Sequence, residues 1–545
     1  MSMPLIAALG PLRAAVAGCL LLTGATTAWS TAPPPAEAKE AAGIAWVHAS
    51  GDSEVDAAFA QAKAEKKPLF LYWGAKWCPP CNQVKATLFN RQEFIARSRA
   101  FVPVYIDGDK PGAQKLGSRF KVRGYPTMVL FNADGTELTR LPGEVGAHQY
   151  TEVLSLGMAA RRPIKAVLAD ARDKARSLSL DANEWRMLAF YSWETDERQL
   201  VTQGDTPSLL KQLAANCPAS QRETADRLLL QSLAAQGDGK PALAAKAADS
   251  AVRERIGKLL DDPRRSRAQM DLLGNQAAEL MKALSPSGSS HHQQLLARFD
   301  AALARLAADE SLSRADRLTA QVARVDLARI GLDKGAKPVI AEKTLQSMRQ
   351  QVERDDREIT DGYERQAVIT TGAYLLAQAG LMAESDQLLV SNLAKSHSPY
   401  YLMSALASNA RQRGDNVQAL RWYAQAHARS DGTATRLQWG ASYLAALVDL
   451  APRDAASIEK VAREIFNDAA TQPDAFYERS GRSLQKVSGK LLTWAKTAAD
   501  DQQAEAVVGR LQKQVDGICA KLPSADPSRS VCEGLLKPGG DGKST

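Results

Sequence analysis

The chain is poor in the residues that most often hold metal ions. Its 545 residues include 6 cysteines and 6 histidines. A structural zinc site takes four cysteine or histidine ligands, usually at close spacings such as C-x-x-C. One C-x-x-C occurs, at residues 78–81, and neither a second one nor a C-x-x-H accompanies it. We therefore expect no metal site, and nothing in the composition indicates a bound cofactor.

Long apolar runs and basic stripes are also lacking. A membrane-spanning helix needs about 18–20 apolar residues, and the run AAVAGCLLL at residues 14–22 falls short of that. The net charge of +8 comes from mixed charges spread along the chain. No basic stripe is interleaved with aromatic residues, as nucleic-acid binding would need. We expect neither a membrane span in the mature chain nor a nucleic-acid partner.

The N-terminus has the pattern of a secretory signal peptide, predicted at residues 1–30. Arg13 precedes the apolar run, and small residues before Ser30 suit cleavage after it. The four residues VAGC that end at Cys19 also fit a lipobox, so lipidation of Cys19 stays an open alternative. Residues 31–43 are rich in proline and alanine and predict a tether. Export would place the mature chain in an oxidising compartment.

In such a compartment the cysteines outside the C-x-x-C are candidates for structural disulfides. Cys519 and Cys532 enclose a polar loop, and this predicts a disulfide within the C-terminal segment 516–545. The segment ends in KPGGDGKST, which predicts a disordered tail. Cys217 is left over, either as a buried thiol or as a partner for one of these two cysteines.

Strand and helix patterns alternate over residues 44–160, which predicts an α/β domain. Apolar stretches indicate strands at residues 69–73, 101–106, 127–131 and 137–141. Apolar residues at helical spacing indicate helices at residues 55–66, 82–96 and 147–160.

Residues 161–515 are rich in alanine, leucine, arginine and glutamine at helical spacing, and strand signals are scarce. This predicts a large all-α region with the form of a helical array or solenoid. Gly380 and Gly414 lie 34 residues apart, and GDNVQALRWYAQA at residues 414–426 resembles a tetratricopeptide repeat. A helical array without a true repeat remains the alternative.

The C-x-x-C has the local features of a redox couple. A strand ends just before Cys78, and Pro79 and Pro80 suit the first positions of a helix, where their missing N–H groups are not needed. Cys78 is then the N-cap, and the N–H of Cys81 can donate to its sulfur. This hydrogen bond and the helix dipole favour the thiolate. We expect Cys78 to be the nucleophile and Cys81 to resolve the mixed disulfide.

The motif and its surroundings resemble the thioredoxin-fold family. WCPPC at residues 77–81 follows an apolar strand, and VRGYPTMVLF at residues 122–131 follows further along. The form of the motif is similar to that of tryparedoxins and of many exported bacterial thioredoxin-like proteins. The resemblance covers about residues 44–160. It implies a thioredoxin fold and thiol–disulfide oxidoreductase activity, with Cys78 and Cys81 as the redox disulfide.

The same resemblance implies a groove for client proteins. Pro126 would follow a cis peptide bond and lie beside the redox disulfide with Thr127. Tyr125 would offer backbone hydrogen bonds to an extended client, and Trp77 would cover the disulfide. Each of these roles is an expectation from the family and not from spacing alone.

Two observations bear on the rate and direction of the reaction. Tyr72 stands where thioredoxins usually carry a buried aspartate that helps the resolving cysteine lose its proton. A phenol with a pKa near 10 is a poor base, so we expect slower resolution. No histidine lies between the cysteines, and no helical insertion is expected between Phe101 and Pro126. These absences favour a reductase or isomerase, which by resemblance would draw electrons from a membrane thiol–disulfide interchange protein.

Asp107 and Asp109 follow the second predicted strand and indicate a solvated turn. The sequence as a whole predicts a periplasmic thiol–disulfide oxidoreductase whose helical region recruits client proteins that have cysteines or disulfides. Two alternatives remain. One is a non-enzymatic helical scaffold that uses the thioredoxin-like domain for docking, and the other is a chaperone-like binding protein that needs neither cysteine.

Overall fold

The computed structural model describes residues 43–143, 145–196, 200–201, 205–237, 249–285, 289–333, 335–497 and 502–537. The predicted signal peptide, Cys19, nearly all of the predicted tether and all of the predicted tail except Lys537 lie outside these residues. The chain from Gly43 onward clusters as one compact unit.

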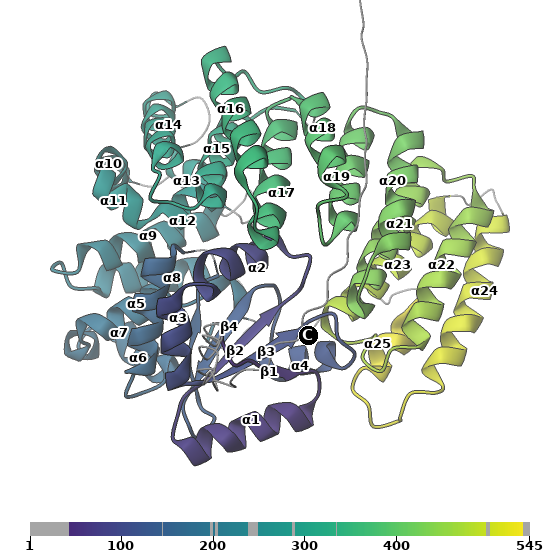
Figure 1. Ribbon diagram of the computed structural model, residues 1–545, viewed down its shortest axis with the longest axis horizontal. Coiled ribbons are helices and arrows are strands. Elements are labelled where there is room, and N and C mark those ends of the chain that lie inside the picture. The colour runs from purple at the N-terminus through teal and green to yellow at the C-terminus, as the bar shows by residue number, and fades with distance from the viewer. Residues whose placement is uncertain are drawn as a thin grey trace, which may run out of the picture. The chain divides into compact units, whose positions relative to one another are not determined.

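A five-stranded sheet forms the centre of the N-terminal part (Figure 1). Its strand order is β1-β3-β2-β4-β5. The strands are β1 (Val47–Ala49), β2 (Leu69–Gly74), β3 (Val102–Asp107), β4 (Thr127–Phe131) and β5 (Glu137–Leu141). β3 runs parallel to β1 and β2, whereas β4 is antiparallel to β2 and β5 to β4. This is the α/β thioredoxin topology that the sequence predicted for the N-terminal part.

The alternation of side chains along β2 divides the apolar residues between the two faces of the sheet. Leu69, Leu71 and Trp73 pack on one face with residues of α1 (Asp52–Glu65) and α4 (Ala113–Phe120). Phe70 and Tyr72 pack on the other face with residues of the helices that follow the C-x-x-C and of α5 (Ala147–Met158). Both faces are therefore buried, and β2 is apolar along its whole length.

The connection from β3 to β4 contains α4, a helix of eight residues that the sequence pattern did not indicate. β4 pairs with β2 and not with β3, so the chain must cross the sheet between them. The stretch between Phe101 and Pro126 therefore holds one short crossover helix.

The single helix predicted at residues 82–96 is wrong in its bounds. The chain forms α2 (Pro79–Val84), a π-helical turn η1 (Lys85–Phe89) and α3 (Gln92–Arg97). The helix starts at Pro79 with Cys78 as its N-cap, as the motif predicted, so the error lies in the unbroken continuation to residue 96. The π turn brings the neighbouring residues Leu88 and Phe89 into the apolar core together, and Arg91 is extended and ends the run.

Helices make up the regular structure of the described residues after α5, apart from two 3₁₀ turns, η3 (Arg176–Ser179) and η4 (Trp193–Thr195). The helices are α6 (Ile164–Arg172), α7 (Ala182–Ala189), α8 (Thr206–Asn216), α9 (Arg222–Gly237), α10 (Ser250–Asp261), α11 (Pro263–Ala268), α12 (Met270–Asn275), α13 (Ala277–Leu284), α14 (His292–Ala308), α15 (Arg314–Ala328), α16 (Glu342–Glu358), α17 (Gly362–Gln378), α18 (Met382–Asn392), α19 (Pro399–Gln412), α20 (Asn416–Arg429), α21 (Thr433–Leu450), α22 (Ala455–Ala470), α23 (Glu478–Thr497), α24 (Gln502–Cys519) and α25 (Arg529–Gly534). The predicted all-α region is thus present.

Neighbouring helices pack together along this region, as with α17 and α18, α19 and α20, and α21 and α22. Gly380 follows α17 and Gly414 follows α19, and both have a positive φ, of 85° and 78°. Glycine tolerates this conformation, which commonly ends a helix. The 34-residue spacing in the sequence therefore marks two equivalent helix ends. That the array follows a tetratricopeptide pattern stays a prediction.

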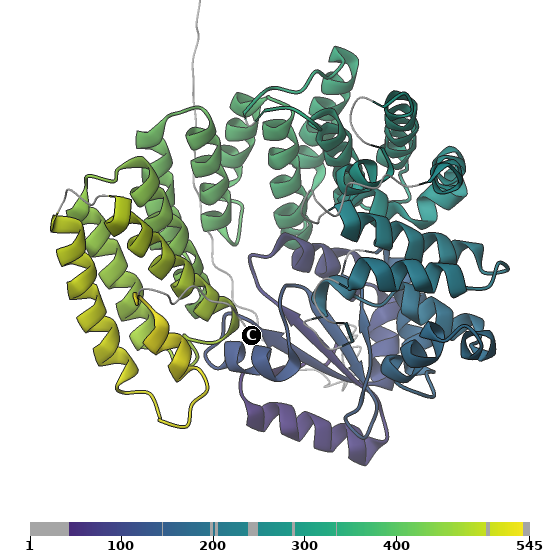
Figure 2. The same ribbon diagram turned by 180° about the vertical axis from the view of Figure 1, so that it is seen from behind.

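The helical region packs against the sheet domain at several places, as both views of the molecule show (Figures 1 and 2). One apolar core extends from Phe70 in β2 through Val153 in α5 to Trp185 in α7 and Leu228 in α9. Further along the chain, α17 packs on α2, and α23 packs on α4. Packing therefore does not stop at residue 160, where the composition changes.

Neither a membrane-spanning helix nor a metal-binding cluster occurs among the described residues. None of the helices there combines the length and the apolar character that crossing a membrane requires. In the same part of the chain, His, Cys, Asp and Glu side chains nowhere gather in threes as a metal site would need.

Candidate active site

Cys78 and Cys81 form a disulfide at the start of α2, with their Cα atoms 5.2 Å apart. Cys78 is the N-cap, in an extended conformation, and its Sγ accepts a hydrogen bond from the N–H of Cys81 at 3.2 Å. Pro79 and Pro80 occupy the first two helical positions and have no N–H to donate. The first free donor of the helix therefore points at the Cys78 sulfur, which favours the thiolate when the disulfide is reduced.

The segment before β4 lies next to this disulfide. The Tyr125–Pro126 peptide bond is cis, as the resemblance implied. Trp77 and Tyr125 pack on a small cluster that contains both cysteines. Thr127 is different, because its side chain is 1% exposed and its hydroxyl already donates to the carbonyl of Gly124 at 2.8 Å. Two of the four predicted groove residues, Trp77 and Tyr125, thus pack on the disulfide, while the Thr127 side chain is turned into the fold.

The helical region covers the disulfide. Cys78 is 2% exposed and Cys81 is 0% exposed. The Trp77 ring lies against Tyr401 from α19 at 5.8 Å, in a stacked arrangement, and against Trp439 from α21 at 5.1 Å, edge to face. Trp77 therefore covers the disulfide, as expected, but its own outer face is occupied by the protein's helices.

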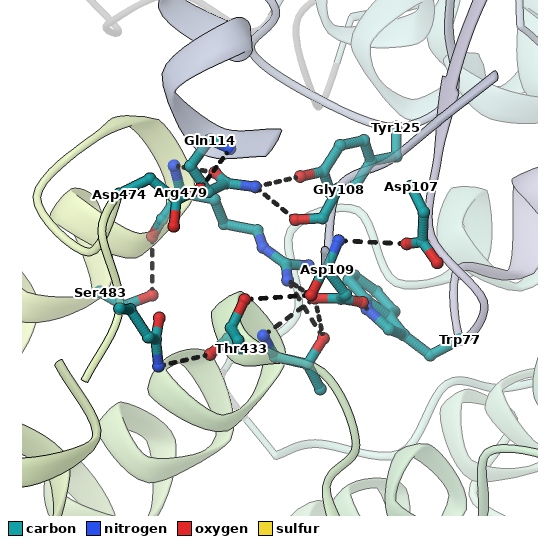
Figure 3. A network of polar contacts seen from close by, with 12 residues as sticks. Trp77, Asp107, Gly108, Asp109, Gln114, Tyr125, Thr433, Asp474, Arg479 and Ser483 are labelled. Carbon is teal, nitrogen blue, oxygen red and sulfur yellow. Dashed lines mark hydrogen bonds and ion pairs between the residues drawn. The ribbon is translucent and has the colours of Figure 1, made fainter. Parts of the chain in front are cut away.

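Asp109 is the centre of a polar network between the sheet domain and the helices (Figure 3). Its Oδ2 accepts from Trp77 Nε1 at 3.1 Å. Its Oδ1 accepts from the backbone N–H of Thr435 at 3.0 Å, from the Thr435 hydroxyl at 2.6 Å and from Arg479 Nη2. The Thr433 hydroxyl donates to its backbone carbonyl at 3.0 Å. We call this set of contacts the Asp109 network.

The prediction of a solvated turn at Asp107 and Asp109 is wrong. Asp109 is 8% exposed because the start of α21 and the start of α23 close over it. Asp107 is half-buried, its carboxylate accepts from the Asp109 N–H at 3.1 Å, and burial raises its pKa. Gly432, at a φ of 97°, lies so close to Asp109 that a Cβ there would come within 2.5 Å of the Asp109 Cβ. Only glycine allows this approach.

Arg479 and Gln114 extend the network towards Tyr125. The Arg479 guanidinium lies over the rings of Trp77 and Tyr125, with centroids 5.1 and 5.2 Å away. Gln114 donates to the Tyr125 hydroxyl at 3.0 Å and accepts from the Arg479 backbone N–H at 2.9 Å. Its own backbone N–H donates to Asp474 at 2.8 Å. Sequence patterns gave no sign of Arg479 or Thr435, because each contacts the site from far along the chain. Gln114 was missed because its partners Asp474 and Arg479 are equally distant.

Tyr72 does not supply the missing base. It is 1% exposed, stacks on Tyr105 with centroids 5.2 Å apart, and belongs to the apolar core. Burial raises the pKa of Tyr72 well above its ordinary value. Within the described residues its hydroxyl has no hydrogen-bond partner. The phenol therefore stays protonated at any physiological pH.

The other cysteines among the described residues belong to other apolar clusters than Cys78 and Cys81. Cys519, at the end of α24, is joined to Cys532 in α25, with Cα atoms 5.7 Å apart. Cys217 is a buried free thiol, which answers the question that its sequence left open. Burial raises the pKa of Cys217 to about 11, so the thiol is protonated and unreactive near neutral pH.

Comparisons with known proteins also indicate a thioredoxin-like domain around this disulfide. A family model described as a thioredoxin-like domain matches residues 55–157. The thiol:disulfide interchange protein DsbD of Klebsiella pneumoniae is 31% identical over 111 residues, which are 20% of this chain and 18% of that protein. DsbD 2 of Pseudomonas aeruginosa is 30% identical over 21% of this chain and 20% of that protein. The chain thus spans about a fifth of the length of these relatives.

A third relative is shorter. The disulfide bond reductase DsbH of Chlamydia pneumoniae is 25% identical over 24% of this chain and 86% of that protein. Among solved structures, oxidised thioredoxin O1 of Arabidopsis thaliana matches 20% of this chain and 95% of its own, at 19% identity and a TM-score of 0.18. A DsbH oxidoreductase matches 22% of this chain and 88% of its own, at 22% identity and a TM-score of 0.19.

Sheet topology, disulfide and family match together define residues 55–157 as a thioredoxin-like domain with a Cys78–Cys81 pair. In this chain that domain is followed by the helices α6–α25.

Proposed function

We propose that this protein is a thiol–disulfide oxidoreductase that exchanges dithiol and disulfide with client proteins, acting as a reductase or isomerase. The observation that carries the proposal is the Cys78–Cys81 disulfide at the start of α2, with the Cys81 N–H on the Cys78 sulfur. The match of residues 55–157 to a thioredoxin-like domain supports it.

The chemistry follows from the positions of the two sulfurs. In the reduced protein the Cys78 thiolate attacks one sulfur of a client disulfide, forms a mixed disulfide and releases one client thiolate. Cys81 then loses its proton and attacks the Cys78 sulfur. This releases the second client thiolate and forms the Cys78–Cys81 disulfide. Two electrons pass to the client, and a donor dithiol must return them.

The direction and compartment are also part of the proposal. The cysteines have no histidine between them, and this supports a reductase or isomerase over a strong oxidant. One relative has the printed name disulfide bond reductase. The signal peptide predicted from residues 1–30 supports a periplasmic location, and a membrane thiol–disulfide interchange protein is the proposed electron donor. The helical region is proposed to recruit the clients.

Insulin reduction with dithiothreitol as electron donor tests the activity. We expect the wild-type protein to accelerate precipitation of the insulin B chain and Cys78→Ser to lose the acceleration. Cys217→Ser is the matched control, since it removes a buried thiol far from the disulfide. In a second experiment Cys81→Ser should trap clients as mixed disulfides that dithiothreitol releases. Equal insulin rates for wild type and Cys78→Ser would refute the proposal.

A non-enzymatic scaffold is the second candidate, and one observation favours it. Both cysteines are buried, and helices α19, α21 and α23 contact Trp77 or Tyr125. A docking module would show such permanent cover. A scaffold or a chaperone-like binder should keep its clients in Cys78→Ser/Cys81→Ser, whereas the oxidoreductase should lose covalent capture in that variant.

A further inference from the structure

A large cavity lies between the redox motif and the helices, and it bears on how clients reach the proposed oxidoreductase. Its volume is about 610 Å³, within the range of about 300–1,000 Å³ that is usual for ligand sites. Trp77, Pro79 and Pro80 form part of its wall, so the residues on both sides of Cys78 line it. The rest of the wall comes mainly from α15, α17, α19 and α21.

Each of these helices presents one face to the cavity. On α19 the lining residues include Tyr401, Ser404, Ala405, Ser408 and Gln412, which recur at the three- and four-residue spacing of a single helical stripe. A stripe on α17 has the same spacing and includes Thr370, Thr371, Tyr374, Ala377 and Gln378. The cavity is therefore bounded by whole helix faces.

The helix faces that line the cavity carry few charges and many polar and aromatic groups. Among the described residues that line the cavity, Asp326 is the single charged one, although 24% of the whole chain is charged. Most of the others have hydroxyls, side-chain amides or aromatic rings. An amide side chain both donates and accepts, so it can bond the N–H and the C=O of an extended backbone. The aromatic rings of Tyr374, Tyr401 and Trp439 offer apolar contact.

The opposite approach to the disulfide is closed. The outer side of Trp77 and Tyr125 is occupied by the Arg479 guanidinium, which the Asp109 network holds in place. A broad folded surface cannot reach Cys78 there without displacing α21 and α23. The cavity reaches Trp77, Pro79 and Pro80 on both sides of Cys78. Cys78 itself is 2% exposed, so these side chains must move slightly before a client in the cavity meets the sulfur.

We propose that this cavity is the client site and that it takes an extended, weakly charged client segment with one cysteine in a disulfide. This inference rests on the proposed function. The segment lies along the stripes of α17 and α19, and the Cys78 thiolate attacks its cysteine sulfur. The new bond is Cys78–S–S–client, and the former partner sulfur leaves as a thiolate.

The experiment uses the full-length chain with Cys81→Ser, so that the first step is isolated. The probe is an uncharged ten-residue peptide with one cysteine, activated as a mixed disulfide with thionitrobenzoate. Attack by Cys78 releases coloured thionitrobenzoate and leaves the peptide on Cys78. The same variant is treated with 5,5′-dithiobis(2-nitrobenzoate), a small disulfide that reports the reactivity of Cys78 itself. The quantity compared between variants is the ratio of the peptide rate to the small-reagent rate.

Ser404→Trp fills the cavity from α19, and Gln425→Trp places the same side chain on an exposed position of α20 as a control. We expect Ser404→Trp to lower the ratio about tenfold or more, which corresponds to about 1.4 kcal/mol of lost interaction. Gln425→Trp should leave the ratio at the parent value. A peptide of the same length with four lysines should react more slowly than the uncharged one.

Tyr374→Ala gives a second, milder variant, because Tyr374 is 51% exposed and its removal leaves the packing of α17 in place. It should lower the ratio less than Ser404→Trp does. Equal ratios for Ser404→Trp, Tyr374→Ala and Gln425→Trp would overturn the client site while leaving the proposed function intact. A Cys81→Ser protein that fails to react even with the small reagent would overturn the proposed function itself.

Discussion

Asp109 and Tyr72 are both buried polar side chains, but among the described residues only Asp109 has hydrogen-bond partners for its side chain. Both carboxylate oxygens of Asp109 accept hydrogen bonds, and a cation pairs with one of them. The Tyr72 hydroxyl is buried without a partner among the described residues. A buried hydroxyl without a hydrogen bond costs about 1–3 kcal/mol. Tyr72 thus contributes its ring to the core and nothing through its oxygen.

Tyr72→Phe should therefore leave the chemistry unchanged. The variant keeps the ring contacts with Phe89 and Tyr105 and removes only the unbonded oxygen. We expect the same insulin-reduction rate and pH profile, and a free energy of unfolding raised by about 1 kcal/mol. Kinetics between pH 6 and 9 and urea unfolding of the oxidised protein measure both. A slower reaction or a shifted pH profile would show that the hydroxyl takes part in proton transfer.

Asp326 predicts a specific dependence of stability on pH. Burial, and then the nearby Glu279, raise its pKa from 3.8 to about 6, against the opposing effects of Arg329 and Lys282. Between pH 4 and 6 the native carboxyl holds a proton that the unfolded chain has lost. Stability therefore falls as pH rises through this interval and levels off above pH 6.

Asp326→Asn should remove that fall. The expected difference from wild type across the interval is about 1–2 kcal/mol, less than the full shift would give because water screens a half-buried carboxylate. Urea unfolding at pH 4, 5, 6 and 7 measures it, with Asp134→Asn on an exposed turn as the control. Parallel pH curves for wild type and Asp326→Asn would show that this carboxyl titrates normally.

For single residues, contacts within one helical turn can be inferred from the sequence, whereas contacts between residues far apart in the chain cannot. Cys78, Pro79 and Cys81 follow from the rules of helix starts, because everything that acts on them lies within one turn. Asp109 could not be recognised as buried, because its partner Arg479 lies 370 residues further along the chain. No short-range pattern contains that pairing.

Among the elements, α21 and α23 are tied to the sheet domain by their first residues. Thr433 and Thr435 at the start of α21 both donate hydrogen bonds to Asp109, and Arg479 at the start of α23 pairs with its carboxylate. The Arg479 and Asp109 side chains are 12% and 8% exposed. Removing one partner of a buried ion pair leaves a charge without compensation, which typically costs about 3–5 kcal/mol.

Asp109→Ala should accordingly lower the free energy of unfolding by about 3–5 kcal/mol. Arg482→Ala is the control, since Arg482 on the same helix makes exposed contacts, an ion pair with Glu478 and a hydrogen bond to the carbonyl of Arg123 in the sheet domain. It should change stability by less than about 1 kcal/mol. Urea unfolding compares the two variants. The double variant Asp109→Ala/Arg479→Met should recover part of the loss, because no unpaired cation remains. Similar values for Asp109→Ala and Arg482→Ala would mean that the Asp109 network adds little to the docking of the helices.

The strands were predicted within a residue or two at β2–β5, because apolar runs bounded by turn residues are direct signals. β1 has three residues, too few for such a pattern. The helix after the motif was predicted as one piece because apolar residues recur through it. The π turn at Lys85–Phe89 shifts the buried face by one residue, and periodicity alone does not reveal such a shift.

Over the whole molecule, the sheet domain and the first helices share one apolar core. Tyr150 and Val153 of α5 and Trp185 and Leu188 of α7 belong to the same cluster as Phe70. Composition changes near residue 160, but the packing continues across that point. The sequence could indicate an all-α region from its periodicity, whereas the surface on which that region packs depends on contacts between distant segments.

A chain that ends at residue 160 should therefore be less stable and more prone to aggregation than the full chain. Its second sheet face would expose residues of α5 that the helical region normally covers. We expect residues 43–160 alone to bind a hydrophobic dye strongly, to aggregate on concentration, and to unfold over a broad urea range. The chain from residue 43 to residue 537 is the matched control. A sharp unfolding transition and normal insulin reduction by residues 43–160 would contradict this prediction.

Burial of the redox motif under α19 and α21 makes electron transfer and helix docking reciprocal. If the docked helices favour one redox form of Cys78 and Cys81, that form favours docking by the same free energy. For a two-electron couple, a preference of about 1.4 kcal/mol moves the reduction potential by about 30 mV. The position of the helices then sets how readily the disulfide accepts electrons, and reduction of the disulfide in turn shifts the position of the helices.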